Sequence, residues 1–436
     1  MMKDLLTIVI PTASRCIFLN RLLNYMCLAK FNCKIIVADS SHSTDLQTNI
    51  HLVKQLSSEL NIKHISYPKE FDIYHKSDLA TQEVKTPYVV ITADDDFLIL
   101  NALNEAVCLL EKNNDYSAVQ GVGLVFNIES GVYYGEIQNI NCEHIKAIGH
   151  NSASQRLIEH LKNYGATWYS VHRTSQLKVN LKKTIELKLD FRFSELFPSS
   201  LSAIQGKCIK IPSLFNIRQS HHIRTSHAQT NYQMHDWIAD NHWSSQYNRF
   251  REYMAGELAK YDNIAIENAL NIVKQAFFYY IITAKTTKST IKDESISIHK
   301  LLTPSHPFHA NFLPVHKIID PFSDRNEWES SYFIQELEQA IQKYKSFPQN
   351  YYITVSLRKA RKIIANKLIN SIPEKIPEFF DNSYIGKSYQ LFINSGFKNE
   401  PLTKDEEAFV QQFLNDKNIS NSLESLKNSL ISCLFV

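Results

Sequence analysis

The chain has 436 residues, of which 44% are hydrophobic and 21% are charged. This composition is typical of globular proteins, and the length suggests about two or three domains. Only 10 residues are glycine, and the chain contains neither a G-x-x-x-x-G-K-S/T phosphate loop nor a G-x-G-x-x-G dinucleotide motif. The net charge of +3, from 47 basic and 44 acidic residues, argues against a nucleic-acid partner.

The cysteines and the apolar segments indicate in which cellular compartment the protein is expected. The 7 cysteines include no C-x-x-C pair, which is typical of free thiols in a reducing compartment. The stretch before Pro11 is too short and too acidic for a signal peptide. The longest apolar stretch, 276–284, is about half as long as a membrane span. We therefore expect a cytoplasmic protein and leave peripheral contact with the inner membrane surface open.

The first half of the chain alternates strand and helix signals. Strands are expected at 5–10, 34–38, 62–67 and 88–92, and helices at 18–30, 44–60 and 73–84. Such alternation predicts crossover connections and an α/β fold with a central, mostly parallel sheet. Two longer strand signals, at 117–128 and 132–140, predict an antiparallel extension of this sheet.

Strand signals nearly vanish after residue 225. Helices are expected at 264–284, 332–344, 356–369 and 405–414. Four prolines make 303–325 an irregular linker. We therefore predict an α/β domain over 1–225 and a mainly helical C-terminal domain over 226–436.

The sharpest chemical feature is the strand at 88–92, which runs into Asp94, Asp95 and Asp96. Three adjacent carboxylates repel one another, and a cation would offset this cost. Alternate acids can offer oxygen ligands to Mg²⁺ or Mn²⁺, which share their remaining positions with water and phosphate oxygens. The alternative is a solvated acidic turn at the start of the next helix.

The segments around this acidic turn resemble the opening of family 2 glycosyltransferases. The matching segments are Leu6–Thr12 with Arg15, Ile35–Ser41 and Thr86–Asp96. The resemblance implies the nucleotide-sugar-binding GT-A fold and a D-x-D metal site at Asp94 and Asp96. It implies donor-binding roles for Pro11, Thr12, Arg15, Asp39, Lys76, Asp94 and Asp95.

Two of these donor-binding assignments have alternatives. The second strand ends in Asp39-Ser40-Ser41, where the family usually has Asp-Asp-Gly-Ser, so the base contact of Asp39 is less certain than the metal site. Lys76 lies where relatives place a basic residue near the phosphates, and its alternative is a solvated helix lysine.

A second acidic segment resembles the family motif that carries the catalytic base. Residues 189–195 precede an expected helix from Leu196 to Gln205 and then Gly206-Lys207. In inverting members an acid at this place deprotonates the acceptor hydroxyl. Glu195 is the match and Asp190 the other candidate, since Leu196 stands where most relatives have a second acid. The alternative role of Glu195 is to stabilise the start of a helix through its dipole.

Three further tracts carry chemistry-bearing residues. Histidines gather between 221 and 242, beside Arg218 and Arg224, and His222 is the candidate metal ligand that would favour Mn²⁺. The aromatic tract 168–173 is either a platform for sugar stacking or plain core packing. The basic stretch 356–369 is either a solvated face or a helix that rests on anionic lipid.

Together these patterns predict a metal-dependent, inverting glycosyltransferase of polysaccharide biosynthesis, with Glu195 as base and Mg²⁺ or Mn²⁺ as cofactor. Its partners would be a nucleotide-sugar donor and a glycan or lipid-linked glycan acceptor. The alternatives are a nucleotidyltransferase and a catalytically silent glycan-binding or scaffold protein. The sequence does not specify the nucleotide, the sugar, the acceptor or the oligomeric state.

Overall fold

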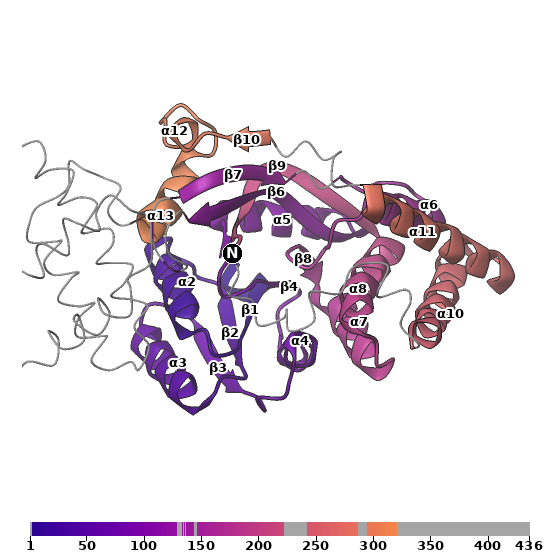
Figure 1. Cartoon of the computed structure of the whole chain (residues 1–436), viewed down its shortest axis with the longest axis horizontal. Coiled ribbons are helices and arrows are strands. Elements are labelled where there is room, and N and C mark those ends of the chain that lie inside the picture. The colour runs from indigo at the N-terminus through magenta and orange to yellow at the C-terminus, as the bar shows by residue number, and fades with distance from the viewer. Residues whose placement is uncertain are drawn as a thin grey trace, which may run out of the picture. The chain divides into compact units, whose positions relative to one another are not determined.

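The computed structural model describes residues 2–128, 133, 135, 137–143, 146–221, 242–286 and 294–320. Within these residues, ten strands form one sheet that is flanked by helices (Figure 1). The strands are β1 (Leu6–Thr12), β2 (Lys34–Asp39), β3 (Ile62–Ser66), β4 (Tyr88–Ile91), β5 (Phe97–Leu98), β6 (Tyr116–Ile128), β7 (Ile137–Glu143), β8 (Val171–Arg173), β9 (Lys207–Gln219) and β10 (Glu294–Ile296). The helices are α1 (Met2–Leu5), α2 (Cys16–Leu28), α3 (Ser43–Leu56), α4 (Ile73–Gln82), α5 (Leu100–Lys112), α6 (Ala153–Lys162), α7 (Thr174–Glu186), α8 (Phe191–Gln205), α10 (Trp243–Asp262), α11 (Ile266–Thr286), α12 (Ile298–Leu301) and α13 (His309–Ile319).

The first four strands of the expected α/β pattern form a parallel array in the order β3-β2-β1-β4. Every residue of β1 and β4 is buried, which explains why both read as continuous apolar runs. Alternate residues of β1, β2 and β4 pack against α4 and α7, as Val9, Ile36 and Val89 do. The α/β fold class is therefore confirmed.

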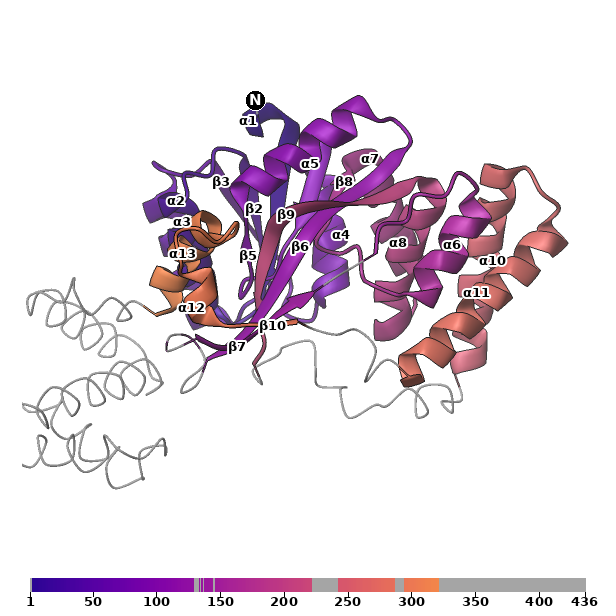
Figure 2. The same cartoon turned by 90° about the horizontal axis from the view of Figure 1, so that it is seen from above.

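The remaining strands extend this array in mixed directions. β8 pairs antiparallel with both β4 and β6, while β9 runs parallel to β6 and antiparallel to β5. β7 pairs antiparallel with β10. Figure 2 shows β6 and β9 lying alongside each other over much of their length. The sequence predicts that further strands extend the sheet. It does not predict that β9 is long enough to end beside the acidic turn that follows β4.

A glycine sits at a close approach of β6 and β9. The register between the two strands shifts between Gln120 and Val122, across Gly121, and again between Val122 and Gly123. A Cβ atom at this position would lie 2.4 Å from the backbone oxygen of Ser213 and 2.7 Å from Cβ of Phe215. Neither atom can move without shifting the backbone, so this position requires glycine.

Gly121→Ala should therefore lower the free energy of unfolding by about 1–3 kcal/mol. Urea unfolding followed by circular dichroism measures this change. Gly256→Ala in α10 is the control, because apart from its chain neighbours and the nearby backbone of its own helix no atom lies within 4 Å of the added Cβ there. The control should raise stability by about 0.5–1 kcal/mol, since alanine is the better helix former. Equal stability of Gly121→Ala and the parent would contradict the close approach of these strands.

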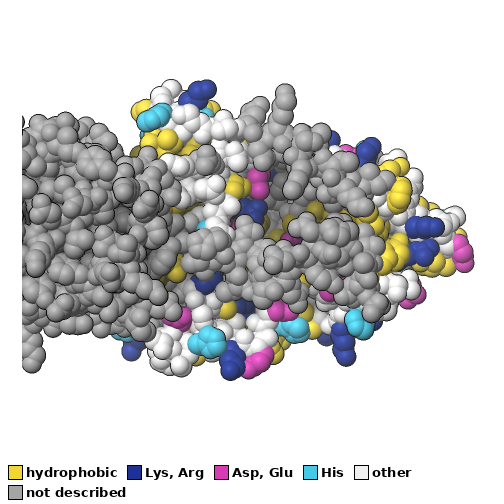
Figure 3. All heavy atoms as spheres, viewed as in Figure 1, with side chains coloured by type: hydrophobic (Ala, Val, Ile, Leu, Met, Phe, Trp, Pro, Cys, Tyr) yellow, Lys and Arg dark blue, Asp and Glu magenta, His cyan; other side chains and the backbone are white. Residues whose placement is uncertain are grey.

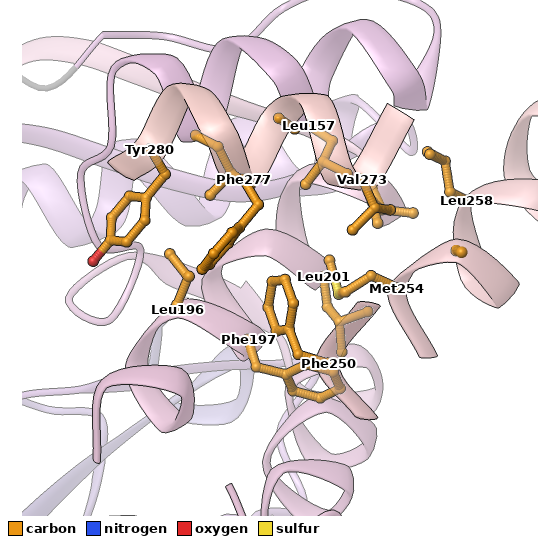
Figure 4. Packing of buried hydrophobic residues seen from close by; sticks show 14 of the residues in the cluster. Leu157, Leu196, Phe197, Leu201, Phe250, Met254, Leu258, Val273, Phe277 and Tyr280 are labelled. Atoms are coloured by element: carbon orange, nitrogen blue, oxygen red, sulfur yellow. The ribbon is translucent and has the colours of Figure 1, made fainter. Parts of the chain in front are cut away.

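A second hydrophobic core joins four helices, α6, α8, α10 and α11. Figure 4 shows side chains from all four pointing toward one another, with Phe197 of α8, Phe250 of α10 and Phe277 of α11 in the middle. The rings of Phe250 and Phe277 are 5.8 Å apart, a typical spacing for packed aromatic rings. Residues 243–286 therefore cover the apolar face of α6 and α8.

The compact units of the chain differ from the predicted domains. One unit comprises Met1–Asn127 and Gln138–Val315, and the other comprises Ile128–Ile137 and His316–Val436. The first unit thus continues past the predicted boundary at 225/226, because α10 and α11 pack on α6 and α8. The loss of strand signals after residue 225 therefore marks a change of secondary structure. It does not mark the end of the hydrophobic core that α6 and α8 share with α10 and α11. Of the second unit, the structure describes only residues 128, 133, 135, 137 and 316–320.

The predicted irregular linker at 303–325 is corrected for its described part, 303–320. Residues His309–Ile319 form α13, which contains Pro314. The expected helices at 332–344, 356–369 and 405–414 lie outside the described residues. Among the helices that are described, none combines the length and the apolar character needed to span a bilayer.

Candidate active site

The carboxyl ends of β1, β2 and β4 lie at one edge of the sheet, together with the end of β9. In open parallel sheets this edge is where ligands bind. Thr12 ends β1, Asp39 ends β2, and the acidic turn Asp94–Asp96 follows β4. In Figure 3, acidic and basic side chains lie next to one another near the middle of the face where Figure 1 shows β6.

Asp94 is bound to the loop after β1. Its Oδ2 accepts a hydrogen bond of 2.6 Å from the Thr12 hydroxyl, and its Oδ1 lies 3.0 Å from the Arg15 guanidinium. Burial raises the pKa of Asp94, while Arg15 acts in the opposite direction. Two of the segments that carry the family resemblance thus meet in space.

Asp95 is held by the side chains of Arg15 and His221. Its Oδ2 contacts the Arg15 guanidinium and lies 2.7 Å from Nε2 of His221. Burial alone would raise the pKa of Asp95, but His221 and Arg15 hold it well below its usual range. This carboxylate therefore stays charged, and it fixes the start of α2 against the end of β9.

Asp96 turns toward β8 and β9. Its Oδ2 accepts a 2.6 Å hydrogen bond from the Tyr169 hydroxyl, and its Oδ1 accepts one of 3.1 Å from the backbone N–H of Gln219. Nε of Arg218 lies 3.6 Å from Oδ2. Burial, together with the neighbouring charge of Asp95, raises the pKa of Asp96 to about 7.

Aromatic rings support the cations of this site. The Phe18 ring lies 4.5 Å from the guanidinium of Arg15 and 5.0 Å from that of Arg21, and it stacks on His221 at 4.8 Å. The Arg218 guanidinium lies 4.7 Å from the centre of the Tyr169 ring. Cations held over aromatic faces are attracted by the ring quadrupole, which fixes their position as well as their charge.

Asp39 and Lys76 connect the ends of β1 and β2. Both Asp39 oxygens are engaged, with the backbone N–H of Ser41 at 2.8 Å, Nδ2 of Asn49 at 2.8 Å and Nε2 of His64 at 2.9 Å. Nζ of Lys76 donates to the carbonyl of Thr12 at 2.6 Å and to the Ser40 hydroxyl at 2.9 Å.

Lys76 is buried, and burial lowers its pKa to about 8. The alternative of a solvated helix lysine is therefore wrong. Pro11 is buried inside β1, in register with Ala38 of β2.

The two candidate bases have different structural roles. Helix α8 begins at Phe191, and the side chain of Asp190 caps it by accepting from the backbone N–H of Phe193 at 2.9 Å. The expectation that the helix begins at Leu196 with Glu195 at its head is wrong, because Asp190 provides the cap one turn earlier. Glu195 lies in the second turn, so the alternative of a capping role for Glu195 is also excluded.

Glu195 is partly buried near the cations of the site. Its Oε1 accepts a 3.0 Å hydrogen bond from the Tyr164 hydroxyl. Burial raises its pKa, while Tyr164, Arg218 and Arg192 act in the opposite direction. Arg218 favours the charged form of both Glu195 and Asp96.

The arrangement of carboxylates decides what kind of metal site fits. Asp94 and Asp95 share Arg15, whereas Asp96 turns to β8 and β9. No three His, Cys, Asp or Glu side chains among the described residues group as a metal site. His222 lies outside the described residues. Mg²⁺, however, is commonly held by one or two carboxylates together with substrate phosphates and water. Both oxygens of Asp94 and of Asp96 already contact protein groups, so these two residues do not form a cage made of protein ligands alone.

Sequence reasoning missed three residues that the fold brings to this site, Phe18, Arg21 and Glu143. It singled out the tracts that contain Tyr169 and His221 but assigned neither residue a contact with the acidic turn. Arg21 follows Phe18 by three residues, which places both on one face of a helix. A cation on an otherwise apolar helix face was the sequence pattern that could have indicated that Arg21 belongs to the site. Tyr169 belongs to the aromatic tract at 168–173, whereas Trp168 of the same tract packs against Tyr74 with ring centres 5.6 Å apart.

No protein-family model matches the chain, and no curated protein matches it either. Among solved structures, S. aureus TarS residues 1–349 match with a TM-score of 0.42 and 13% identity, over 82% of this chain and 91% of that chain. The same fragment in complex with UDP-GlcNAc matches with a TM-score of 0.44 and 12% identity, over 82% and 92%. A further TarS structure matches with a TM-score of 0.41 and 14% identity, over 81% of this chain and 55% of that chain. At these TM-scores the likeness carries no inference about activity.

Proposed function

We propose that the chain is a glycosyltransferase that moves a sugar from a nucleotide-sugar donor to a hydroxyl of a glycan or lipid-linked glycan. One observation carries this proposal. The loop after β1 binds the acidic turn after β4 directly, through Thr12 and Arg15 on Asp94. These are two of the segments in which the sequence resembles family 2 glycosyltransferases, and they meet at the edge of the sheet that suits a ligand.

The charges of the site suit a diphosphate leaving group. In our proposal Asp94 and Asp96 would hold Mg²⁺ or Mn²⁺, with His222 as a further ligand, and the bound ion supplies positive charge that stabilises the departing diphosphate. Arg15 and Arg218 add fixed cations around the same turn. Such pre-positioned charges stabilise a transition state without having to reorganise.

The nucleotide would lie against the ends of β1 and β2. Lys76 holds these ends together through Thr12 and Ser40, and Asp39 holds the turn at Ser41. Because both Asp39 oxygens already accept hydrogen bonds, we assign Asp39 to shaping the base-binding turn. Pro11 fixes the strand beneath it.

Glu195 would act as the general base. Its carboxylate accepts the proton of the acceptor hydroxyl while that oxygen bonds to the anomeric carbon. The bond from this carbon to the diphosphate breaks on the opposite face, which inverts the configuration. Burial raises the pKa of Glu195 and so makes the carboxylate a stronger proton acceptor than an exposed one.

A thermal-shift screen with UDP, GDP and CDP, each with Mn²⁺ or Mg²⁺, tests donor binding. One nucleoside diphosphate should raise the unfolding midpoint, because a ligand at 100 times its dissociation constant stabilises the folded state by about 2.7 kcal/mol. The same nucleotide with EDTA is the control and should give a smaller shift. An unchanged midpoint with all three nucleotides would contradict the proposal.

The products of turnover separate the alternatives. A panel of UDP-, GDP- and CDP-sugars should include one that releases a nucleoside diphosphate and the free or transferred sugar. A nucleotidyltransferase would release pyrophosphate from a nucleoside triphosphate and a sugar phosphate. A silent glycan-binding protein would release neither product.

A further inference from the structure

A tyrosine outside the sheet contacts the carboxylate to which we assign the proton transfer. Tyr164 lies between α6 and β8, and its hydroxyl donates to Oε1 of Glu195 at 3.0 Å. Burial, and then the charge of Glu195, raise the pKa of Tyr164 well above its usual value. The phenol therefore keeps its proton and acts as a hydrogen-bond donor at neutral pH.

The ring of Tyr164 is fixed by neighbours from two helices. It meets the His160 ring of α6 at 5.3 Å and the Tyr280 ring of α11 at 5.2 Å, both nearly edge to face. It packs against the hydrophobic core that α6, α8, α10 and α11 share. In Figure 4, Tyr280 extends from α11 toward α8, next to Leu196, the neighbour of Glu195 in the chain. The hydroxyl is thus anchored by packing that does not involve the sheet.

Other charged and titratable groups surround Glu195 from several elements. Arg218 of β9 and Arg192 of α8 favour its charged form. Burial, and then the charge of Glu195, raise the pKa of Tyr74 of α4 and of Tyr280 of α11. The charge of Asp190 acts on both in the same direction. Arg218 also forms ion pairs with Asp96 and with Glu143, and its guanidinium lies 3.2 Å from the Glu143 carboxylate. The Tyr164 hydroxyl bonds directly to one oxygen of the Glu195 carboxylate.

We propose that Tyr164 is the positioning residue for Glu195, holding Oε1 so that Oε2 is presented to the acceptor hydroxyl. This inference rests on the proposed function, in which Glu195 is the base. It assigns a catalytic purpose to the helical core as well, since α6 and α11 fix the ring that fixes the carboxylate. A carboxylate with one anchored oxygen loses less freedom when the acceptor binds, so more of its orientations are productive.

Tyr164→Phe tests the inference because it removes the hydroxyl and keeps the ring. The substrate is whichever UDP-, GDP- or CDP-sugar of the panel releases nucleoside diphosphate fastest. We expect kcat to fall by about tenfold, the scale of one hydrogen bond to a charged group, with the donor KM unchanged. The acid limb of the kcat profile should move to higher pH, since the charged form of Glu195 loses a stabilising hydrogen bond.

Tyr88→Phe is the matched control. The Tyr88 hydroxyl also donates to a glutamate, Oε1 of Glu111 at 2.5 Å, but this pair joins β4 to α5 outside the site. The control should leave kcat and the pH profile unchanged. The position of the acid limb does not depend on how much active protein is present, so it stays informative if Tyr164→Phe folds less well.

Three outcomes would overturn the inference. One is an unmoved acid limb in Tyr164→Phe, and another is a near-parental kcat in this variant while Glu195→Gln is inactive. The third is a Tyr164→Phe effect that persists in full in the Glu195→Gln background, because residues that act through each other are not additive. If Glu195→Gln itself retains parental turnover, the assignment of the base fails first, and this result is separate from the other three.

Discussion

Asp96→Asn is expected to abolish metal-dependent nucleotide binding and to leave the fold intact. In the parent, Oδ1 of Asp96 accepts a 3.1 Å hydrogen bond from the backbone N–H of Gln219. Asparagine keeps the size of the side chain, and its oxygen can still accept this bond. The substitution removes the negative charge that a hard cation needs from its ligands. We expect calorimetry with Mn²⁺ to show a loss of nucleoside diphosphate affinity of about 100-fold or more, on the scale that catalytic-site charges contribute.

The control for this experiment is a carboxylate of similar charge away from the site. Asp115 lies 2.9 Å from Nζ of Lys207 and is largely exposed. Asp115→Asn should leave nucleotide affinity unchanged, because exposed ion pairs contribute little and this one does not touch the acidic turn. Binding of UDP, GDP and CDP that neither EDTA nor Asp96→Asn alters would exclude the metal site. Circular dichroism of both variants checks that the fold is retained.

The parallel half of the fold could be predicted because burial on both faces leaves a simple pattern. Strands such as β1 and β4 are continuous apolar runs, and each ends at a polar turn. The carboxyl ends of parallel strands share one edge of a sheet, so Thr12, Asp39 and Asp94 could be expected near one another. The structure bears out this proximity, with Thr12 and Asp94 in direct contact.

The remaining parts of the site depend on tertiary contacts that leave no local pattern. Arg218 and His221 reach the acidic turn only because β9 runs for 13 residues beside β6. In the sequence, nothing distinguishes Tyr169 from many other aromatic residues. In the structure, the pairing of β8 with β4 brings Tyr169 to Asp96. The start of α8 was misjudged because Asp190 and Glu195 are both plausible at a helix N-terminus. Only the hydrogen bond from Phe193 separates their roles.

The compact units differ from the predicted domains for a related reason. The helices at 243–286 carry an apolar stripe whose partner is not encoded in the stripe itself. Their partner is the apolar face of α6 and α8, which precede them in the chain. A helix pattern predicts that a face is buried, but it does not predict which neighbour buries it.

Glu195→Gln is expected to lower turnover by about 10²- to 10⁴-fold and to leave donor affinity nearly unchanged. Glutamine keeps the size of the side chain and an oxygen that can accept from the Tyr164 hydroxyl, which lies 3.0 Å from Oε1. It cannot take a proton, so the substitution isolates the role of the base. In the parent, burial raises the pKa of Glu195, and the active charged form is lost as the pH falls through this raised value. The parental kcat should therefore have an acid limb above the usual glutamate pKa, and Glu195→Gln should lack this limb.

Asp190→Asn is the matched variant for this last experiment. Asparagine is as good an N-cap as aspartate, so α8 should keep its start and turnover should stay close to that of the parent. A large loss in Asp190→Asn with near-parental turnover in Glu195→Gln would transfer the role of base to Asp190. Parental turnover in both variants would leave the inverting mechanism without a base, and a retaining reaction would then be the explanation. A parallel loss of activity and of thermal stability in Glu195→Gln would instead make Glu195 a structural residue of α8, because a base serves the reaction and not the fold.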